Sequence, residues 1–171
     1  EGDPVNIVNQ LRQNMISLEE VIEGIEFASY DSNYYYHVES HTIVMLTSDD
    51  INFAESEKDI EEAPEWQREN IKLAYEFIEG PIDAFIKLPE GFEINEYSMM
   101  ESFISNIEHD RIRNELWEAI TGKGAFRRFK DTVFKLGIRN DWFEYRDKCY
   151  REIAKKWCEA YNIEYEVKEE E

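Results

Sequence analysis

The sequence predicts an α+β fold that is mostly helical, with a small antiparallel β-sheet built around a hairpin in the N-terminal half. Apolar residues recur at helical spacing after capping motifs, two β-rich runs are separated by a short turn, and a third β-rich run follows. A chain of 171 residues without internal repeats or a long linker has the size of one compact domain. We therefore expect a single domain over residues 1–171, with 1–15 as an N-terminal extension and 168–171 as a frayed acidic tail.

The first predicted elements are a helix and a hairpin. Ser17-Leu-Glu-Glu20 has the form of a capping box, and the apolar residues after it predict a helix over about 17–28. The runs 33–38 and 41–46 predict the two strands of the hairpin. Its turn, Glu39-Ser40, lacks the glycine that usually accommodates a tight hairpin.

The next predicted elements are a loop, a helix and a strand. The stretch 48–63 is acidic and weakly patterned, so it predicts a loop. Pro64 suits the first turn of a helix, and Trp66 begins an apolar stripe on that helix. Gly80-Pro81 ends the helix, and residues 84–88 predict a short strand.

The second half of the chain predicts mainly helices. Ser98-Met-Met-Glu101 has the form of a second capping box, and a helix over about 112–120 follows. Another helix stops at Gly137, which suits a left-handed residue after a helix end. The last helix is expected over about 141–162, with residues 163–167 as an edge strand.

The composition is that of a folded protein. Ten Phe, ten Tyr and four Trp residues are too many for a disordered acidic segment, despite a formal net charge of -20. No apolar run approaches the roughly 20 residues that a membrane span needs, and the N-terminus lacks the pattern of a secretory signal. We therefore expect a cytoplasmic protein with no membrane partner.

The two cysteines predict no disulfide. Cys149 and Cys158 lie nine residues apart in one predicted helix, so a rise of about 1.5 Å per residue separates their backbones by about 13 Å. That separation exceeds the reach of a disulfide. Both cysteines are expected to be reduced packing residues, as in a reducing compartment.

Basic residues gather in one part of this acidic chain. Residues 121–157, here called the basic segment, hold eleven of the 19 Lys and Arg residues but only five of the 39 Asp and Glu residues. The segment therefore has a net charge of +6, whereas the rest of the chain has a net charge of -26. This separation of charge favours either an anionic partner or ion pairs with the acidic remainder.

The stretch GKGAFRRFKD, residues 122–131, contains the candidate ligand site. Two glycines precede a helix whose first amides and neighbouring bases suit a phosphate or another anion, with Arg127 and Arg128 as forked donors. The predicted anion-binding residues are Lys123, Gly124, Arg127, Arg128 and Arg146. The alternative is structural: the same bases pair with acids elsewhere and hold the C-terminal helices against the N-terminal half.

Arg146 also has a predicted structural role. It lies beside the apolar line of its helix, one turn after Trp142, so we expect it to be half buried. A half-buried arginine usually has a carboxylate partner, and Asp131 is the candidate if the chain reverses at Gly137. The sequence therefore predicts an ion pair between Asp131 and Arg146.

The combination of these motifs resembles a bacterial protein family that has no assigned activity. The resemblance extends from about residue 16 to 163 and is carried by S-L-E-E-x-I, the Tyr-rich hairpin, the Trp66 helix, GKGAFRRFKD, and W-F-E-Y-R-D with a following R-E-I-A-x-x-W. It implies a small bacterial cytosolic protein. The residues that match the family signature are Gly122, Gly124, Phe126, Arg127, Phe129, Trp142 and Arg146. Residues 1–15 and the Glu39-Ser40 turn depart from the family pattern.

The sequence contains no recognised catalytic or metal-binding motif. It lacks the G-x-S-x-G nucleophile pattern, the phosphate-loop spacing and the residue order of a calcium loop. His37 and His41 flank the hairpin turn, but two histidines without a nearby cysteine make a weak metal site. We therefore expect no metal and no cofactor.

The function predicted from these observations is that of a non-enzymatic binding or regulatory protein, with a protein or a small anionic ligand as partner. One alternative is a nucleic-acid-binding protein that uses the same basic segment, although no recognised RNA or DNA motif is present. Another is a small hydrolase with a site that the sequence does not identify. A third is that the acidic faces mimic nucleic acid or bind a basic partner.

Overall fold

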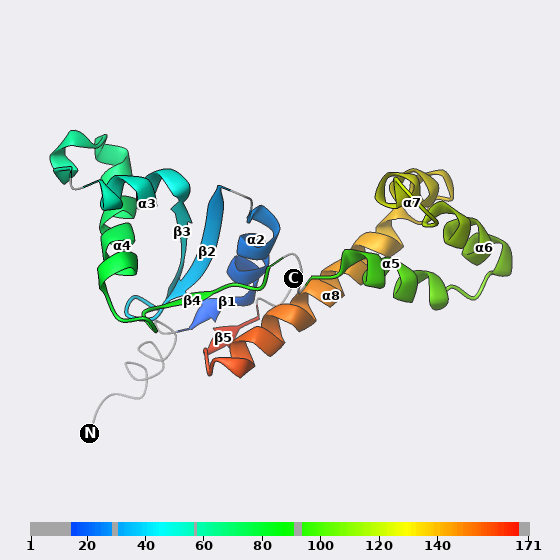
Figure 1. The fold of residues 1–171 in the computed structure, drawn as a ribbon. Coiled ribbons are helices and arrows are strands. Elements are labelled where there is room, and N and C mark those ends of the chain that lie inside the picture. The colour runs from blue at the N-terminus through cyan, green and yellow to red at the C-terminus, as the bar shows by residue number, and fades with distance from the viewer. Residues whose placement is uncertain (1–14, 29–30, 57, 91–93, 168–171) are drawn as a thin grey trace, which may run out of the picture. The chain divides into compact units, whose positions relative to one another are not determined.

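The computed structural model describes residues 15–28, 31–56, 58–90 and 94–167. The chain divides into two compact units, the first made of residues 1–90 and 154–171 and the second of residues 91–153. The last helix, α8 (Arg139–Ala160), begins in the second unit and ends in the first (Figure 1). The single domain stays a prediction, because units that share one continuous helix can still fold together. The predicted extension over 1–15, apart from Met15, and the predicted tail lie outside the described residues.

The α+β prediction is confirmed, and the first unit contains the antiparallel sheet. Its strands, in the spatial order β3-β2-β4, are β2 (Ser32–His37), β3 (Thr42–Thr47) and β4 (Phe85–Lys87). The predicted hairpin is formed by β2 and β3, in a register that pairs His37 with Thr42. The turn includes His41, whose φ of 53° lies in the left-handed region that glycine usually occupies.

Helix α2 (Leu18–Phe27) lies against one face of this sheet (Figure 1). It begins at the predicted capping box, in which Ser17 is the N-cap residue. A side chain added at Gly24 would come within 2.6 Å of Leu88, so glycine allows the close approach of the helix. Burial of Leu18 and its apolar neighbours then fixes which side of α2 faces the sheet.

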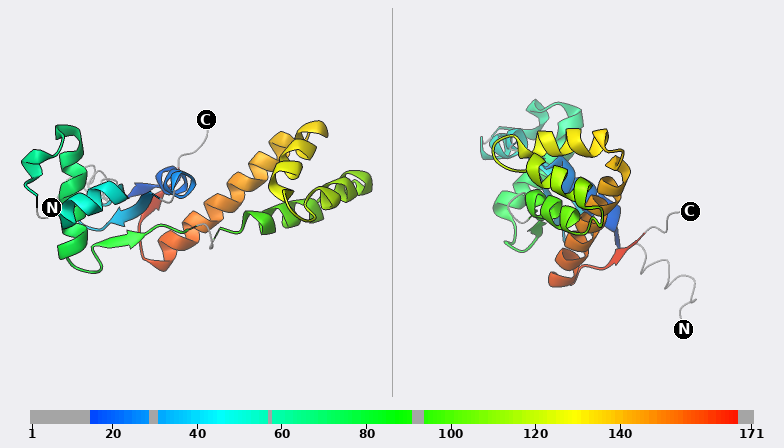
Figure 2. Two further views of the ribbon diagram at one scale, coloured as in Figure 1. Left: turned by 45° about the horizontal axis from the view of Figure 1, so that its top comes forward. Right: turned by 90° about the vertical axis from the view of Figure 1, so that its right-hand side faces the viewer.

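Helices α3 (Ser48–Glu55) and α4 (Arg68–Glu79) lie on the opposite face (Figures 1 and 2). The apolar cluster beneath them consists of Leu46, Ala54 and Ala74. Successive strand residues point to opposite faces of a sheet. Tyr35 accordingly packs on this cluster, whereas Tyr34 lies close to Gly24 of α2.

Helix α3 corrects the predicted loop over 48–63. Thr47 Oγ1 accepts a hydrogen bond from Asp50 N at 3.2 Å, and Asp50 Oδ2 accepts from Thr47 N at 3.0 Å, which together form a capping box. A short 3-10 helix, η1 (Ile60–Glu62), follows. The capping pattern was present in the sequence, but too few apolar residues follow it to produce a clear helical period.

The second unit is helical. Its elements are α5 (Glu96–Ser105), α6 (Asp110–Ala119), α7 (Ala125–Lys135) and the N-terminal part of α8 (Figure 2). Its core is aromatic, with the rings of Phe103, Phe129 and Trp142 in edge contact at centroid distances of 4.8 to 6.3 Å. Helix α5 begins earlier than predicted, because the side chain of Asn95 caps the amide of Ser98.

The predicted C-terminal strand is present but short. Strand β5 (Tyr165–Glu166) pairs in parallel with β1 (Ile16–Ser17), and these two strands form a sheet of their own. Ile163, just before β5, is buried. The pairing therefore holds residues 165–166 beside the start of α2.

Candidate functional site

The two glycines of GKGAFRRFKD form a turn between α6 and α7. Gly122 has a φ of 79° and Gly124 a φ of 78°. Side chains are disfavoured in this left-handed region, so the backbone itself requires glycine at both positions. The backbone of the turn therefore explains the presence of both glycines without any ligand.

Arg128 holds this turn in place. Its guanidinium donates hydrogen bonds to four backbone carbonyl oxygens, those of Ala119, Thr121, Gly122 and Lys123. Ala119 is the last residue of α6, so these bonds satisfy carbonyls that lack a partner within the helix. The prediction that Arg128 is a forked donor to an anion is therefore corrected, because carbonyl groups already occupy its donors.

Arg127, the other predicted forked donor, lies in solvent. Its side chain is 90% exposed, and its Nε lies 4.0 Å from Asp131 Oδ2, one turn further along α7. An exposed pair of this kind contributes little to stability. Lys123 is exposed in the turn that precedes α7. The predicted cluster of Lys123, Arg127 and Arg128 around one anion is thus not formed.

Arg146 belongs to a half-buried network with Glu96 and Tyr150. Its Nε and Nη2 donate to Glu96 Oε1 at 3.1 and 2.7 Å, and Tyr150 Oη donates to the same oxygen at 2.6 Å. The guanidinium also lies over the Tyr150 ring, 4.3 Å from its centroid. The predicted half-burial of Arg146 is confirmed, but the predicted partner Asp131 is wrong: the carboxylate is that of Glu96, on α5.

This network lowers the pKa of Glu96 below its ordinary value of 4.5. Burial raises the pKa, but the hydrogen bonds from Tyr150 and Arg146 and the charges of Arg146 and Lys130 outweigh it. A carboxyl group with a lowered pKa in the folded state stabilises the fold at pH values above its unfolded pKa. That contribution is lost as the pH falls through the folded-state pKa.

The replacement Glu96→Gln tests this network. We expect it to lower the free energy of unfolding by about 1 kcal/mol at neutral pH, because a neutral amide binds Arg146 more weakly and water partly screens the site. The difference from wild type should shrink as the pH falls below 4.5. Urea unfolding at several pH values measures this difference in the free energy of unfolding. The variant Glu118→Gln, which replaces an exposed glutamate, serves as the reference. A deficit that persists unchanged at low pH would contradict the role assigned to the carboxylate.

A pocket of about 340 Å³ lies within the basic segment, at residues of α7 and α8. Its lining residues are Lys130, Asp131, Val133, Phe134, Arg139, Trp142 and Phe143. Two bases, three aromatic rings, one valine and the acid of an exposed ion pair therefore share a single concave surface. We call it the α7–α8 pocket.

The chemistry of the α7–α8 pocket is both basic and aromatic. Phe134 is 70% exposed and Phe143 is 46% exposed, whereas the ring of Trp142 is buried. The guanidinium carbon of Arg139 lies 5.1 Å from the centroid of the Phe143 ring. A partner that presents negative charge together with an apolar group matches these surfaces.

The sequence pointed to the basic segment but not to this pocket. Lys130 and Arg139 are two of its bases, but no motif marks Phe134. A signal was available, because Lys130 and Phe134 are four residues apart and so lie on the same face of a helix. Lys130 and Phe134 lie near Arg139 and Phe143 only because the chain reverses at Gly137, between α7 and α8.

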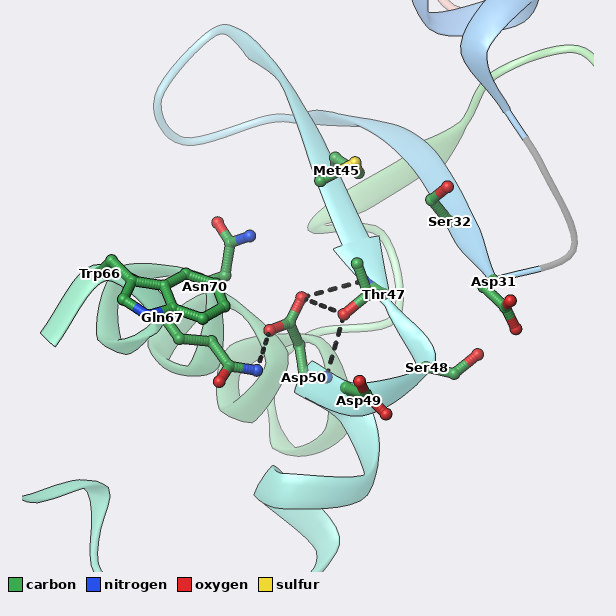
Figure 3. Close-up of a pocket in the computed structure, with 10 residues that line it drawn as sticks. All are labelled: Asp31, Ser32, Met45, Thr47, Ser48, Asp49, Asp50, Trp66, Gln67 and Asn70. Atoms are coloured by element: carbon green, nitrogen blue, oxygen red, sulfur yellow. Dashed lines mark hydrogen bonds between the residues drawn. The ribbon is translucent and has the colours of Figure 1, made fainter. Parts of the chain in front are cut away.

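A second pocket, of about 500 Å³, lies in the first unit beside the start of α3 (Figure 3). Its lining residues are Asp31, Ser32, Met45, Thr47, Ser48, Asp49, Asp50, Trp66, Gln67 and Asn70. Trp66 belongs to a short 3-10 helix, η2 (Glu65–Gln67), and is 81% exposed. The predicted place of Trp66 on an apolar stripe is therefore corrected.

Asp50 is the buried acid of this second pocket. It is 2% exposed and accepts hydrogen bonds from the amide and hydroxyl of Thr47 and from the side-chain amide of Gln67 (Figure 3). Throughout the described residues, no buried side-chain nitrogen or oxygen lacks a partner. The carboxylate of Asp50 thus serves the protein itself and is not directed at a ligand.

The histidines at the hairpin turn have separate partners. His37 is buried, with Nε2 2.9 Å from Glu76 Oε1 and Nδ1 2.7 Å from Ser40 Oγ. His41 Nδ1 lies 2.8 Å from the hydroxyl of Tyr36. The side chains that hydrogen-bond to His37 therefore come from α4 and the turn, and His41 is not among them.

The cysteines are free, as predicted. Burial raises the pKa of the Cys158 thiol to about 11. Burial also raises the pKa of Cys149, against a hydrogen bond from Tyr145 that lowers it. Both groups are therefore thiols at neutral pH, which is consistent with packing residues and not with nucleophiles.

The described helices include none that is both long enough and apolar enough to cross a membrane. No family model, no curated protein and no solved structure matches this chain. The resemblance to a bacterial family therefore stays a prediction. The function rests on the geometry and the charge of the site.

Proposed function

We propose that this chain is a non-enzymatic, cytoplasmic binding protein whose α7–α8 pocket holds an acidic and apolar segment of a partner protein. The observation that supports this function is the presence of Lys130 and Arg139 beside the exposed rings of Phe134 and Phe143 in one pocket of about 340 Å³. Aromatic and arginine side chains are enriched at protein interfaces and often contribute most of the binding energy.

Charge complementarity supports an acidic partner segment. Other bases of the same unit have partners within it: Lys135 lies 2.7 Å from Glu115, and Arg146 pairs with Glu96. The structural alternative expected these bases to form ion pairs with acids of the N-terminal half. Lys135 and Arg146 instead form them within their own unit. Within the described ranges, Lys130 and Arg139 form no direct ion pair with an acidic side chain. They are the bases that an acidic segment would neutralise.

The other candidate functions have weaker support. A nucleic acid carries a phosphate at every nucleotide and would bring several of them close to Asp131, whereas an acidic and apolar segment places few charges in the pocket and also covers the exposed rings. A hydrolase would need an activated nucleophile, and the described lining residues of both pockets include no serine or cysteine paired with a histidine. Tighter binding of a nucleic acid than of an acidic peptide would favour that alternative.

A peptide selection tests the proposed function directly. A library of random peptides displayed on phage is selected on the full chain and counter-selected on the Lys130→Ala/Arg139→Ala variant. We expect the enriched peptides to combine aspartate or glutamate with aromatic or aliphatic residues. Their dissociation constants are then measured by fluorescence anisotropy, beside a single-stranded RNA of mixed sequence.

The variants separate pocket binding from general charge attraction. Loss of both pocket bases should weaken the selected peptides at least about tenfold, equivalent to about 1.4 kcal/mol. Arg111→Ala/Lys148→Ala removes the same charge outside the pocket lining and should change affinity little. Phe134→Ser should also weaken binding, since it removes apolar contact without changing charge. Equal affinity for all four proteins, or tighter binding of the RNA, would exclude the proposed function.

A further inference from the structure

We propose that His37, Glu39 and Glu76 form a binding site for one divalent transition-metal ion. One ligand atom from each residue lies within 4.8 Å of the other two. The residues come from the end of β2, the hairpin turn and α4, all within the first unit. This site is independent of the proposed function, which uses the second unit.

The distances suit a shared ion. Metal bonds of about 2.0 to 2.2 Å place two ligand atoms of one ion roughly 3 to 4 Å apart. His37 Nε2 and Glu76 Oε1 lie 2.9 Å apart, at the short end of this range. Glu39 is exposed on the turn, and one of its carboxylate oxygens lies within 4.8 Å of the ligand atoms of His37 and Glu76.

The imidazole of His37 is held in an orientation that suits coordination through Nε2. The residue is 5% exposed, and its ring stacks on Phe85 with centroids 4.8 Å apart. Nδ1 lies 2.7 Å from Ser40 Oγ, which lies 2.7 Å from Thr42 Oγ1. With a metal on Nε2, the Nδ1 proton is donated to Ser40, and the Ser40 hydroxyl donates to Thr42. A hydrogen bond at the second ring nitrogen is typical of metal-bound histidine.

The ligand set selects the class of metal. One imidazole nitrogen and two carboxylate oxygens suit zinc, manganese, iron(II) or cobalt better than calcium or magnesium, which prefer oxygen ligands alone. Two carboxylates balance the charge of a divalent ion. Three protein ligands leave at least one position for water or another ligand, as in zinc sites that are not purely structural. Without a metal, a proton between Nε2 and Glu76 makes the observed hydrogen bond.

Zinc and cobalt titrations test the site on the full chain without a polyhistidine tag. The titrations are performed in excess Mg²⁺, so that weak binding to the many surface carboxylates does not contribute. We expect calorimetry to show one tight Zn²⁺ per chain, and Co²⁺ to produce visible absorption bands that Zn²⁺ abolishes. Absence of tight Zn²⁺ binding to the wild-type chain would overturn the proposal.

Single replacements assign the ligands. Glu39→Gln alters an exposed side chain and should preserve the fold while it weakens Zn²⁺ at least about tenfold. His37→Gln should abolish tight binding, and circular dichroism checks that this variant is folded. Two control variants should bind Zn²⁺ as tightly as the wild type does. They are Glu79→Gln, on the same helix as Glu76, and His41→Asn, in the same turn as Glu39. Unchanged Zn²⁺ affinity in Glu39→Gln would show that a different group of side chains binds the ion.

Discussion

Replacing Arg128 with alanine is expected to lower the free energy of unfolding by about 2 to 3 kcal/mol, a large effect for one surface-facing arginine. The guanidinium donates to four carbonyl groups at the end of α6 and in the turn that follows. Alanine leaves these carbonyls without their donor, at a helix end where the backbone supplies none. The two left-handed glycines of the turn, Gly122 and Gly124, then lose the side chain that orders them.

The neighbouring Arg127→Ala provides the matched comparison. Arg127 is 90% exposed and makes only a 4.0 Å pair with Asp131, so its loss should change stability by less than about 0.5 kcal/mol. Thermal unfolding should show a midpoint lowered by roughly 4 to 12 °C for Arg128→Ala only. Hydrogen exchange of amides 120–125 should accelerate in the same variant. Equal stability of the two variants would refute the structural role of Arg128.

Replacing Asp50 with alanine is expected to cost about 2 to 4 kcal/mol, the larger value reflecting its burial. Asp50 is 2% exposed and accepts hydrogen bonds from two groups of Thr47 and one of Gln67 (Figure 3). The substitution leaves half-buried donors of Thr47 and Gln67 without an acceptor and removes the capping box that starts α3. Helix α3 packs on the sheet through Ala54, so the loss extends to that apolar cluster.

Two further substitutions sharpen the test of Asp50. Asp49→Ala removes an exposed acid from the same helical turn and should cost only about 0.3 to 1 kcal/mol, its interaction with the helix dipole. Asp50→Asn keeps the size but turns one acceptor into a donor, which opposes either Thr47 or Gln67, so it should also destabilise markedly. Urea unfolding, monitored by circular dichroism, measures the free energy of unfolding of the three variants. A cost for Asp50→Ala no greater than for Asp49→Ala would mean that the buried network contributes little.

Elements with a local signal were predictable from sequence. The S-x-x-E box starts α2, alternating β-rich residues form the hairpin, and Gly137 ends α7 because these preferences depend on a few adjacent residues. Helix α3 was missed although Thr47 and Asp50 form the same kind of box. Its apolar residues become a recognisable face only against the sheet and α4.

The candidate sites show where sequence reasoning reaches its limit. Charge alone reveals the basic segment, yet the predicted partners of Arg128 and Arg146 differ from those in the structure. Arg128 turns back to the end of α6, and Arg146 binds a glutamate 50 residues earlier in the chain. Which group a long side chain reaches is decided by the packing of helices, which no local spacing encodes.

The sequence by itself determined the fold class, the separation of charge, the glycine turn before α7 and the absence of a disulfide, because these follow from composition, backbone preference and helical rise. The tertiary structure alone decided that Lys130 and Arg139 share a pocket with exposed aromatic rings, and that Glu76 lies beside His37. These groups are distant in the chain or lie on different helices. Burial of apolar faces brings them together, and the polar side chains take the partners that this packing leaves within reach.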